Sequence, residues 1–253
     1  QFHHSPTYGG VCEIRGGSLP FKQYITVALT YGVVVAFFYL FGYWGAFNIN
    51  VFEFIGLADL ARLSIYPLVG SLLLFLVGWA LTELIKGDAY PPGGGAETPL
   101  GRFGIKYWRY LVALNVLLIA IVARFPSTPY RWFFVAMLIA SFGAPLSHLK
   151  FIITYIPNPR LRASILSLML VIPGFAFADG HLDAHLIKNG YGALNVDAVR
   201  SKLPLTVEVK KPVAYIGYLG EYFALYEATS QSVVFVKLKD DAPLFLNPNQ
   251  AHN

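Results

Sequence analysis

Residues 23–52 read QYITVALTYGVVVAFFYLFGYWGAFNINVF and contain no Lys, Arg, Asp or Glu. About 20 apolar residues are enough to cross the hydrocarbon of a bilayer as a helix, and only a helix or a closed barrel satisfies its own backbone hydrogen bonds there. The stretch therefore predicts a membrane-spanning helix at about 22–46. It is longer than a signal-peptide core and lacks a small-residue cleavage site, so we expect a retained anchor.

Four further stretches are almost as apolar. Residues 63–82, 132–149 and 163–178 contain no charged side chain, and residues 110–123 form a shorter run after several basic residues. We expect further helices at about 63–85, 105–124, 131–154 and 162–178. The last segment is short and contains Pro173 and Gly174. It predicts either a tilted span or a re-entrant segment that leaves the membrane on the side where it entered.

The composition agrees with an α-helical membrane bundle of about five transmembrane helices. Hydrophobic residues make up 56% of the 253 residues and charged residues 13%, whereas about 25% of the residues of a soluble domain are charged. The single Cys12 excludes an intramolecular disulfide. Nothing in the sequence calls for a cofactor. The net charge of +5 is explained by basic loops, so we expect the lipid bilayer as a partner and no nucleic acid.

Basic residues indicate the orientation, because cytoplasmic loops retain Lys and Arg. With a cytoplasmic N-terminus, the inner segments carry Arg15, Lys22, Lys86, Arg102, Lys106, Arg109, Lys150, Arg160 and Arg162. The outer segments then carry only Arg62, Arg124 and Arg131. We therefore expect a cytoplasmic N-terminus. Five spans in a bacterial inner membrane place the C-terminal module in the periplasm, which is the topology that we expect. Four spans and a re-entrant segment would leave it in the cytoplasm.

From Asp179 onward the long apolar runs give way to short alternating segments. A short helix is expected at 193–202, followed by strands at 205–209, 213–218, 222–227, 233–238 and 243–246. The chain thus divides into an N-terminal segment (1–21), a transmembrane helical domain (22–178) and a soluble α+β tail with a small antiparallel sheet (179–253). A sheet of about 50 residues has a marginal core alone, so we expect it to dock on the helices or on another subunit.

Two polar features lie beside the predicted spans. Residues 48–62 carry three charged side chains among apolar positions and predict a short amphipathic helix in the interface. Glu83 and Lys86, and likewise His148 and Lys150, lie at predicted helix ends. They are interpreted as anchors rather than as an ion pathway, because none lies in the middle of a span.

The densest polar cluster, residues 179–185, reads DGHLDAH. His181 and His185 would share one face of a helix, a spacing that can hold zinc with a carboxylate such as Asp183 as third ligand. The Glu that follows the first His in zinc proteases is missing. The alternatives are a polar exit from the membrane that ends in a capped turn, and a pH-sensing role for the imidazoles.

Residues 215–226 read YIGYLGEYFALY and are rich in tyrosine. Tyr215, Tyr218, Tyr222 and Tyr226 can pack as cross-strand core residues. The segment contains more aromatic side chains than so small a core can bury. Some of these tyrosines are therefore candidates for binding a protein partner.

The layout of a first span, the segment NINVFEFIGLADL (48–60), further spans and the tail with YIGYLGEYFALY resembles small uncharacterised bacterial polytopic inner-membrane proteins with a C-terminal β-module. The resemblance implies an immunity factor or an accessory subunit. No nucleophile motif was found. We therefore expect a non-enzymatic binding protein whose β-module recognises a protein partner or a second copy. A small channel or transporter component, and a metal-dependent membrane enzyme that uses the His cluster, remain alternatives.

Overall fold

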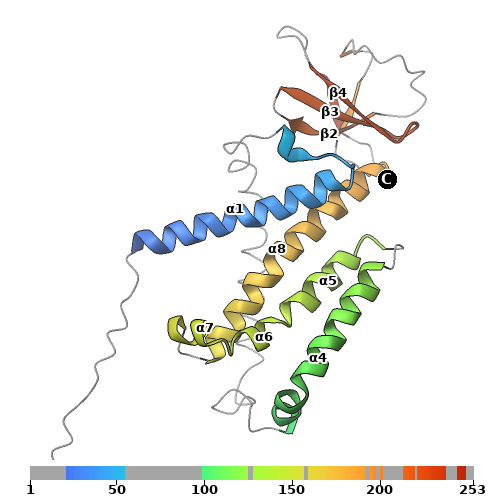
Figure 1. The fold of residues 1–253 in the computed structure, drawn as a ribbon. Helices are drawn as coiled ribbons and strands as arrows, with labels where there is room; N and C mark the ends of the chain where they lie inside the picture. Colours follow the sequence, from blue (N-terminus) through green and yellow to red (C-terminus); the bar gives the residue numbers. More distant parts are fainter. Residues whose placement is uncertain are drawn as a thin grey trace, which may run out of the picture.

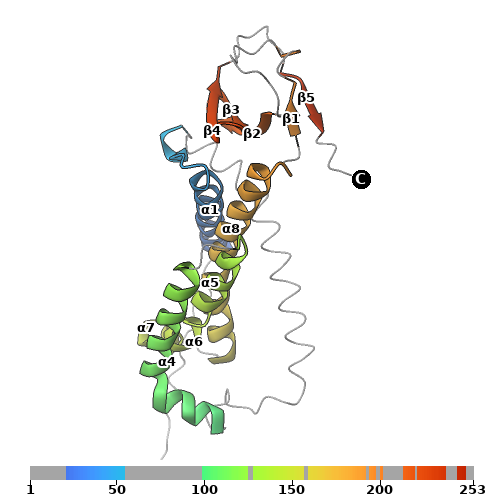
Figure 2. The same ribbon diagram turned by 90° about the vertical axis from the view of Figure 1, so that its right-hand side faces the viewer.

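The computed structural model describes residues 21–54, 99–124, 128–156, 159–191, 194–197, 200–201, 213–219, 221–237 and 244–248. The helices are α1 (Phe21–Gly45), α4 (Pro99–Arg124), α5 (Arg131–Ala140), α6 (Gly143–Leu146), α7 (Lys150–Tyr155) and α8 (Pro159–Lys188), with a 3-10 turn η1 (Val51–Glu53). The strands are β1 (Leu194–Val196), β2 (Val213–Leu219), β3 (Tyr222–Glu227), β4 (Ser232–Val236) and β5 (Leu246–Pro248). The sheet lies at one end of the helices, where α1 and α8 both end (Figures 1 and 2).

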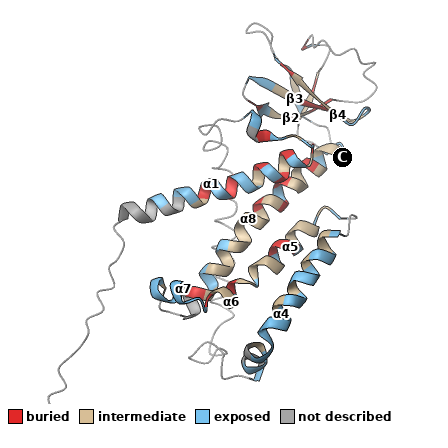
Figure 3. Cartoon of the chain, viewed as in Figure 1, coloured by how far each residue is buried: buried red, intermediate tan, exposed pale blue. Residues whose placement is uncertain are grey.

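Two of the described helices are long and apolar enough to cross a membrane. They cover Lys106–Arg124 in α4 and Arg162–Lys188 in α8, while Leu29–Gly45 and Arg131–Leu146 are shorter apolar helices. The α4 segment buries no side chain inside the protein, as its exposed surface in Figure 3 illustrates. Helices followed by a small antiparallel sheet are thus confirmed, but a bundle of five spans is not. The helix expected at 63–85 lies outside the described residues.

The predicted helices have different bounds in the structure. α1 confirms the first one within a residue at each end. α4 begins at Pro99 instead of at 105 and is kinked at Tyr107, where φ is −110° and ψ is 16°. The helix expected at 131–154 is divided into α5, α6 and α7. Pro145 has no N–H to donate to the carbonyl of Ser141, four residues earlier, which removes one helical hydrogen bond where α5 gives way to α6.

α8 is a continuous helix that ends ten residues beyond the predicted position 178. Because it does not turn back, it does not have the shape of a re-entrant segment (Figure 1). Pro173 lies inside it and cannot donate to the carbonyl of Met169. The hydroxyl of Tyr31, on α1, donates to this carbonyl at 3.2 Å. A side chain of one helix thus replaces the backbone donor that the other helix lacks.

Glycines allow the helices to approach each other closely. A Cβ added at Gly42 would lie 2.2 Å from the carbonyl oxygen of Phe177, and one at Gly180 would lie 2.3 Å from that of Tyr39. The two glycines therefore place the backbones of α1 and α8 in mutual contact. Gly143 fulfils the same role against Ser167 of α8, as is common for small residues between packed apolar helices.

Both α1 and α8 end in a Schellman motif, which directs the chain into the sheet region. After α1, Asn48 adopts a φ of 60°, and the N–H of Ile49 donates to the carbonyl of Trp44 at 3.1 Å. After α8, Gly190 has a φ of 84°. Asn and Gly are the residues that tolerate this left-handed conformation best.

The segment that follows α1 differs from the predicted amphipathic helix over 48–62. Its described part, which ends at Phe54, contains only the single turn η1. Val51 of this turn is buried in the core against the sheet. The remainder, from residue 55, lies outside the described residues.

The five strands form one antiparallel sheet in the order β4-β3-β2-β1-β5. The strands expected at 213–218, 222–227 and 233–238 are confirmed as β2, β3 and β4, and β5 begins three residues later than the last predicted strand. The segment 205–209 lies outside the described residues. The helix expected at 193–202 is wrong. Residues 194–196 form β1 there, because Val196 is buried in the core on one face of the sheet.

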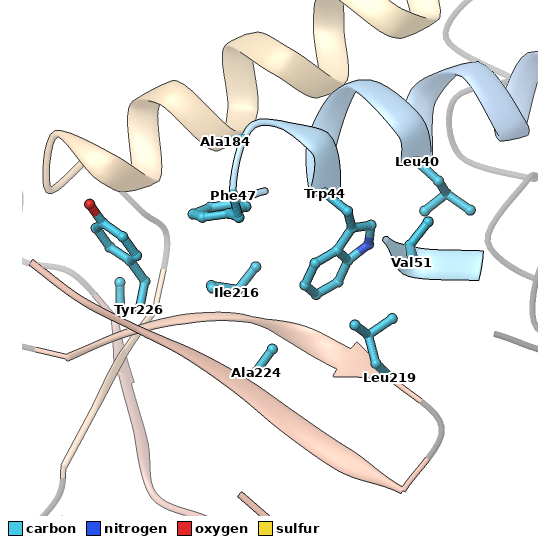
Figure 4. Packing of buried hydrophobic residues seen from close by; sticks show 10 residues of the cluster. Leu40, Trp44, Phe47, Val51, Ala184, Ile216, Leu219, Ala224 and Tyr226 are labelled. Atoms are coloured by element: carbon cyan, nitrogen blue, oxygen red, sulfur yellow. The ribbon is translucent and has the colours of Figure 1, made fainter. Parts of the chain in front are cut away.

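The sheet has an apolar core on each face. One face meets α1, the turn after it, η1 and α8. There Leu40, Trp44, Phe47, Val51 and Ala184 pack on Ala214, Ile216, Leu219, Ala224 and Tyr226 of the sheet (Figure 4). On the other face, Val196, Val213, Leu225 and Val236 pack together. Docking against α1 and α8 confirms that the sheet uses the helices to complete its core.

Candidate functional site

A β-bulge positions the surface of β2 that faces α1. Tyr215 pairs with Leu225 and Gly217 with Ala224, so Ile216 is an extra residue in the ladder. The hydroxyl of Tyr43 donates to the carbonyl of Ile216 at 2.7 Å. Such a bond compensates the carbonyl where a bulge disrupts the ladder.

The residue after the bulge lies tightly against Trp44. A Cβ added at Gly217 would lie 3.2 Å from the ring of Trp44, which packs on this part of the sheet. Leu219 then points into the core with Trp44. Because neighbouring residues of a strand point to opposite faces, Tyr218 is directed to the other face.

Two of the four candidate tyrosines belong to the protein's own packing. Tyr226 is only 5% exposed, and its ring lies 5.6 Å from that of Phe47 in the turn after α1. The structure thus makes it a core residue rather than a partner-binding one. Tyr215 is half-buried beside the second core, and burial raises the pKa of its hydroxyl above the usual value.

The other two candidates are exposed at the end of the β2–β3 hairpin. Tyr218 is 53% exposed and Tyr222 is 38% exposed. They belong to adjacent ladder pairs, Tyr218 with Phe223 and Leu219 with Tyr222, and so point to opposite faces. Tyr218 is supported by the ring of Phe223 at 4.9 Å.

An ion pair accompanies these tyrosines. Lys237, which follows β4, donates to the carboxylate of Glu221 in the hairpin turn. The same ammonium lies 5.9 Å from the ring centroid of Tyr222. Its hydrogen bond and charge lower the pKa of Glu221, and Glu221 in turn raises the pKa of Lys237. We call Tyr218, Glu221, Tyr222 and Lys237 the hairpin tip.

The second candidate site, residues 179–185, lies within the last part of α8. Asp183 accepts a hydrogen bond from the hydroxyl of Tyr39 at 2.8 Å. The ring of His181 lies 6.0 Å from that of Trp132 of α5. The side chain of Asn189 contacts Nδ1 of His185 at 2.9 Å. Each of the three predicted metal ligands therefore has a different neighbour.

The geometry of a helix explains why these three side chains do not converge. His181 and His185 lie one turn apart, whereas Asp183 is about 200° away around the axis. Among the described residues, no group of three His, Cys, Asp or Glu side chains could hold one metal ion. His181 and Trp132 instead each have a buried ring nitrogen, Nδ1 and Nε1, without a hydrogen-bond partner.

Of the four ionisable residues interpreted as anchors at helix ends, two belong to the described part of the chain. His148 and Lys150 are exposed at the break between α6 and α7, as expected for groups at a helix end. Glu83 and Lys86 lie outside the described residues.

The structural roles of Tyr39 and Tyr43 were not predicted from the sequence. The available signal was their spacing. Two tyrosines four residues apart, with Gly42 between them, place hydroxyls on the face of α1 that carries the close contact.

Comparison of the chain with protein-family models, with curated proteins and with solved structures found no match.

Proposed function

We propose that this chain is a non-enzymatic, membrane-anchored binding protein that presents the hairpin tip to a protein partner. The observation that carries the proposal is the exposure of Tyr218 and Tyr222 on a sheet that is itself docked on the helices. Aromatic side chains dominate the binding energy of protein interfaces. An immunity factor or an accessory subunit are the functions of this class that we favour.

The docking of the sheet supports recognition by a preorganised surface. Trp44 and Phe47 fill the space between α1 and the sheet (Figure 4), and Tyr43 bonds to the bulge beside them. A hairpin held in this way loses little further conformational entropy when a partner binds. The phenol groups supply large contact areas with few rotatable bonds.

The membrane part of the proposal follows the charge pattern. α4 and α8 run towards the sheet end and α5 runs away from it (Figure 1), so their ends alternate as expected for successive spans. We propose insertion into a bacterial inner membrane with the N-terminus in the cytoplasm and the sheet in the periplasm. The concentration of Lys and Arg in the segments that would be cytoplasmic supports this orientation.

A transporter component is the second candidate. Asp179, His181 and Asp183 are ionisable groups on an apolar helix that packs between α1 and α5. Ionisable groups in such a position are functional candidates because their burial is costly. Ion flux through vesicles that contain only the purified chain would favour this function over partner binding.

Crosslinking from the hairpin tip tests the binding function. A photoreactive amino acid is placed at Tyr218 or Tyr222 in the full chain, with the exposed Thr229 of the β3–β4 turn as control position. A defined adduct is expected from the first two positions only. Tyr218→Ala should weaken capture of that partner by about 30-fold, as for an interface hot spot, at an unchanged protein level. Equal adducts from all three positions would contradict the proposal.

Removal of residues 205–253 is a coarser test, because it exposes the core residues Trp44 and Phe47. The helices are nevertheless expected to stay inserted while biological activity is lost. A truncated chain with full activity in cells would place the function in the helices instead.

A reporter fused after Asn253 tests the orientation. If the reporter is one that works only in the periplasm, the fusion protein should show reporter activity. Activity of a cytoplasmic reporter alone would mean that the number of crossings before the sheet is even.

A further inference from the structure

Among the described residues, the end of the helices opposite the sheet carries basic side chains and no acidic one. Residues 98–178 include no Asp or Glu. Arg102, Lys106 and Arg109 are exposed in the first part of α4, and Lys150 is exposed at the start of α7. Both views place these segments at the end of the helices that is farthest from the sheet (Figures 1 and 2).

The carboxylates of the described residues all belong to the other end. They are Glu53, Asp179, Asp183, Asp197, Glu221 and Glu227, and they lie in the sheet region or in the half of α8 next to it. No carboxylate in the described part of the chain is therefore available to neutralise the basic end.

Helix dipoles add to this positive charge instead of opposing it. Arg102 is the fourth residue of α4 and Arg162 the fourth residue of α8, and neither helix has an acidic residue in its first turn. A cation at a helix N-terminus is unfavourable unless an anion offsets it. Both helices therefore place the positive end of the helix dipole beside basic side chains at the same end of the protein.

Arg162 contributes a buried charge for which the described part of the chain supplies no carboxylate. The residue is only 6% exposed, and its Nη1 donates to the carbonyl of Ile156 at 3.2 Å. Its Nε is buried without a hydrogen-bond partner. A buried cation without a carboxylate is costly, so this arrangement favours an external anion at the surface above it.

Aromatic rings surround the exposed cations of α4. The ring of Phe103 lies 4.8 Å from that of Tyr107. Lys106 lies over the ring of Tyr107 at 5.3 Å, and Arg109 over that of Trp108 at 5.7 Å. The kink at Tyr107 turns the first part of α4 away from the axis of the rest (Figure 2). Tyr and Trp beside basic residues are typical of the headgroup level of a membrane.

We propose, on the basis of the membrane insertion described above, that this basic belt (Arg102, Lys106, Arg109 and Lys150) binds the phosphate groups of anionic phospholipids in the adjoining leaflet. Each cation near an anionic membrane surface strengthens binding about fivefold. The belt thereby fixes the depth of α4 in the membrane through the kinked first segment.

Quenching of tryptophan fluorescence by brominated lipids tests this proposal. The full chain is reconstituted into vesicles of phosphatidylcholine that contain a fixed fraction of brominated phosphatidylglycerol, or the same fraction of brominated phosphatidylcholine. The Trp108→Phe variant identifies the share of the signal that comes from Trp108. In the wild-type chain, brominated phosphatidylglycerol should quench the fluorescence of Trp108 more strongly than brominated phosphatidylcholine does.

The variant R102Q/K106Q/R109Q should lose this preference, by about fivefold in relative association constant for each cation removed. Arg124→Gln, an exposed cation at the other end of α4, is the matched control and should retain it. The proposal would be overturned if the triple variant kept the preference for phosphatidylglycerol, or if the wild-type chain showed no such preference. Neither result would contradict membrane insertion. Extraction of the wild-type chain from vesicles by alkaline carbonate would overturn membrane insertion as well.

Discussion

The hydroxyl of Tyr43, near the end of α1, donates to the carbonyl of Ile216, the extra residue of the β2 bulge, at 2.7 Å. This bond joins the helices to the sheet across 173 residues of sequence. It lies next to the contact between Trp44 and Gly217. The bulge, the glycine and the phenol together set which tyrosines of the hairpin reach the surface.

Tyr43→Phe should loosen the docking of the sheet. The ring packing remains, but the carbonyl of Ile216 loses its donor, which costs about 1–3 kcal/mol for a buried group. Hydrogen exchange should accelerate in β2 and β3 with little change in α4. Unchanged exchange in β2 would mean that packing alone holds the sheet.

Gly42→Ala and Gly180→Ala should each separate α1 from α8. The added Cβ would lie 2.2 or 2.3 Å from a backbone oxygen of the facing helix, and forced overpacking costs about 1–3 kcal/mol. Thermal unfolding in detergent measures the loss. Gly104→Ala is the matched control, because nothing lies within 4 Å of its Cβ position. Equal stability of all three variants would contradict the close contact.

Tyr31 and Pro173 should be coupled. Tyr31→Phe removes the donor to the carbonyl of Met169, at a cost of about 1 kcal/mol. Pro173→Ala restores a backbone N–H that can donate to the same carbonyl. In a double-mutant cycle, the cost of Tyr31→Phe should therefore shrink in the Pro173→Ala background. Strictly additive effects would show that the phenol does not compensate for the proline.

The carboxyl group of Glu221 should titrate below its usual range. Its pKa is lowered by the hydrogen bond and charge of Lys237, so the stabilisation by this pair is present above the ordinary pKa of Glu. It is lost as the pH falls through the lowered pKa of the folded state. NMR titration should show the pKa of Glu221 rising in Lys237→Gln. Because the pair is exposed, the overall stability should hardly change.

Local patterns in the sequence determined the kind of each main element. The uncharged run at residues 23–52 specifies α1, because a polar backbone among apolar side chains must bond within its own helix. The Val- and Tyr-rich segments specify β2 and β3, since alternating side chains suit the two faces of a sheet. The exposed Tyr218 and Tyr222 were among the residues predicted to bind a partner, although the pattern alone did not separate them from Tyr226.

Tertiary contacts decided the rest. Residues 179–185 are helical because α8 continues through them. The close contact with α1 at Gly42 and Gly180 leaves room for this continuation. Helical geometry then separated Asp183 from His181 and His185 and removed the predicted metal site. Residues 194–196 became a strand because β2 and β5 pair with them. Such outcomes depend on neighbours distant in sequence, and local periodicity carries no information about which neighbour a residue will meet.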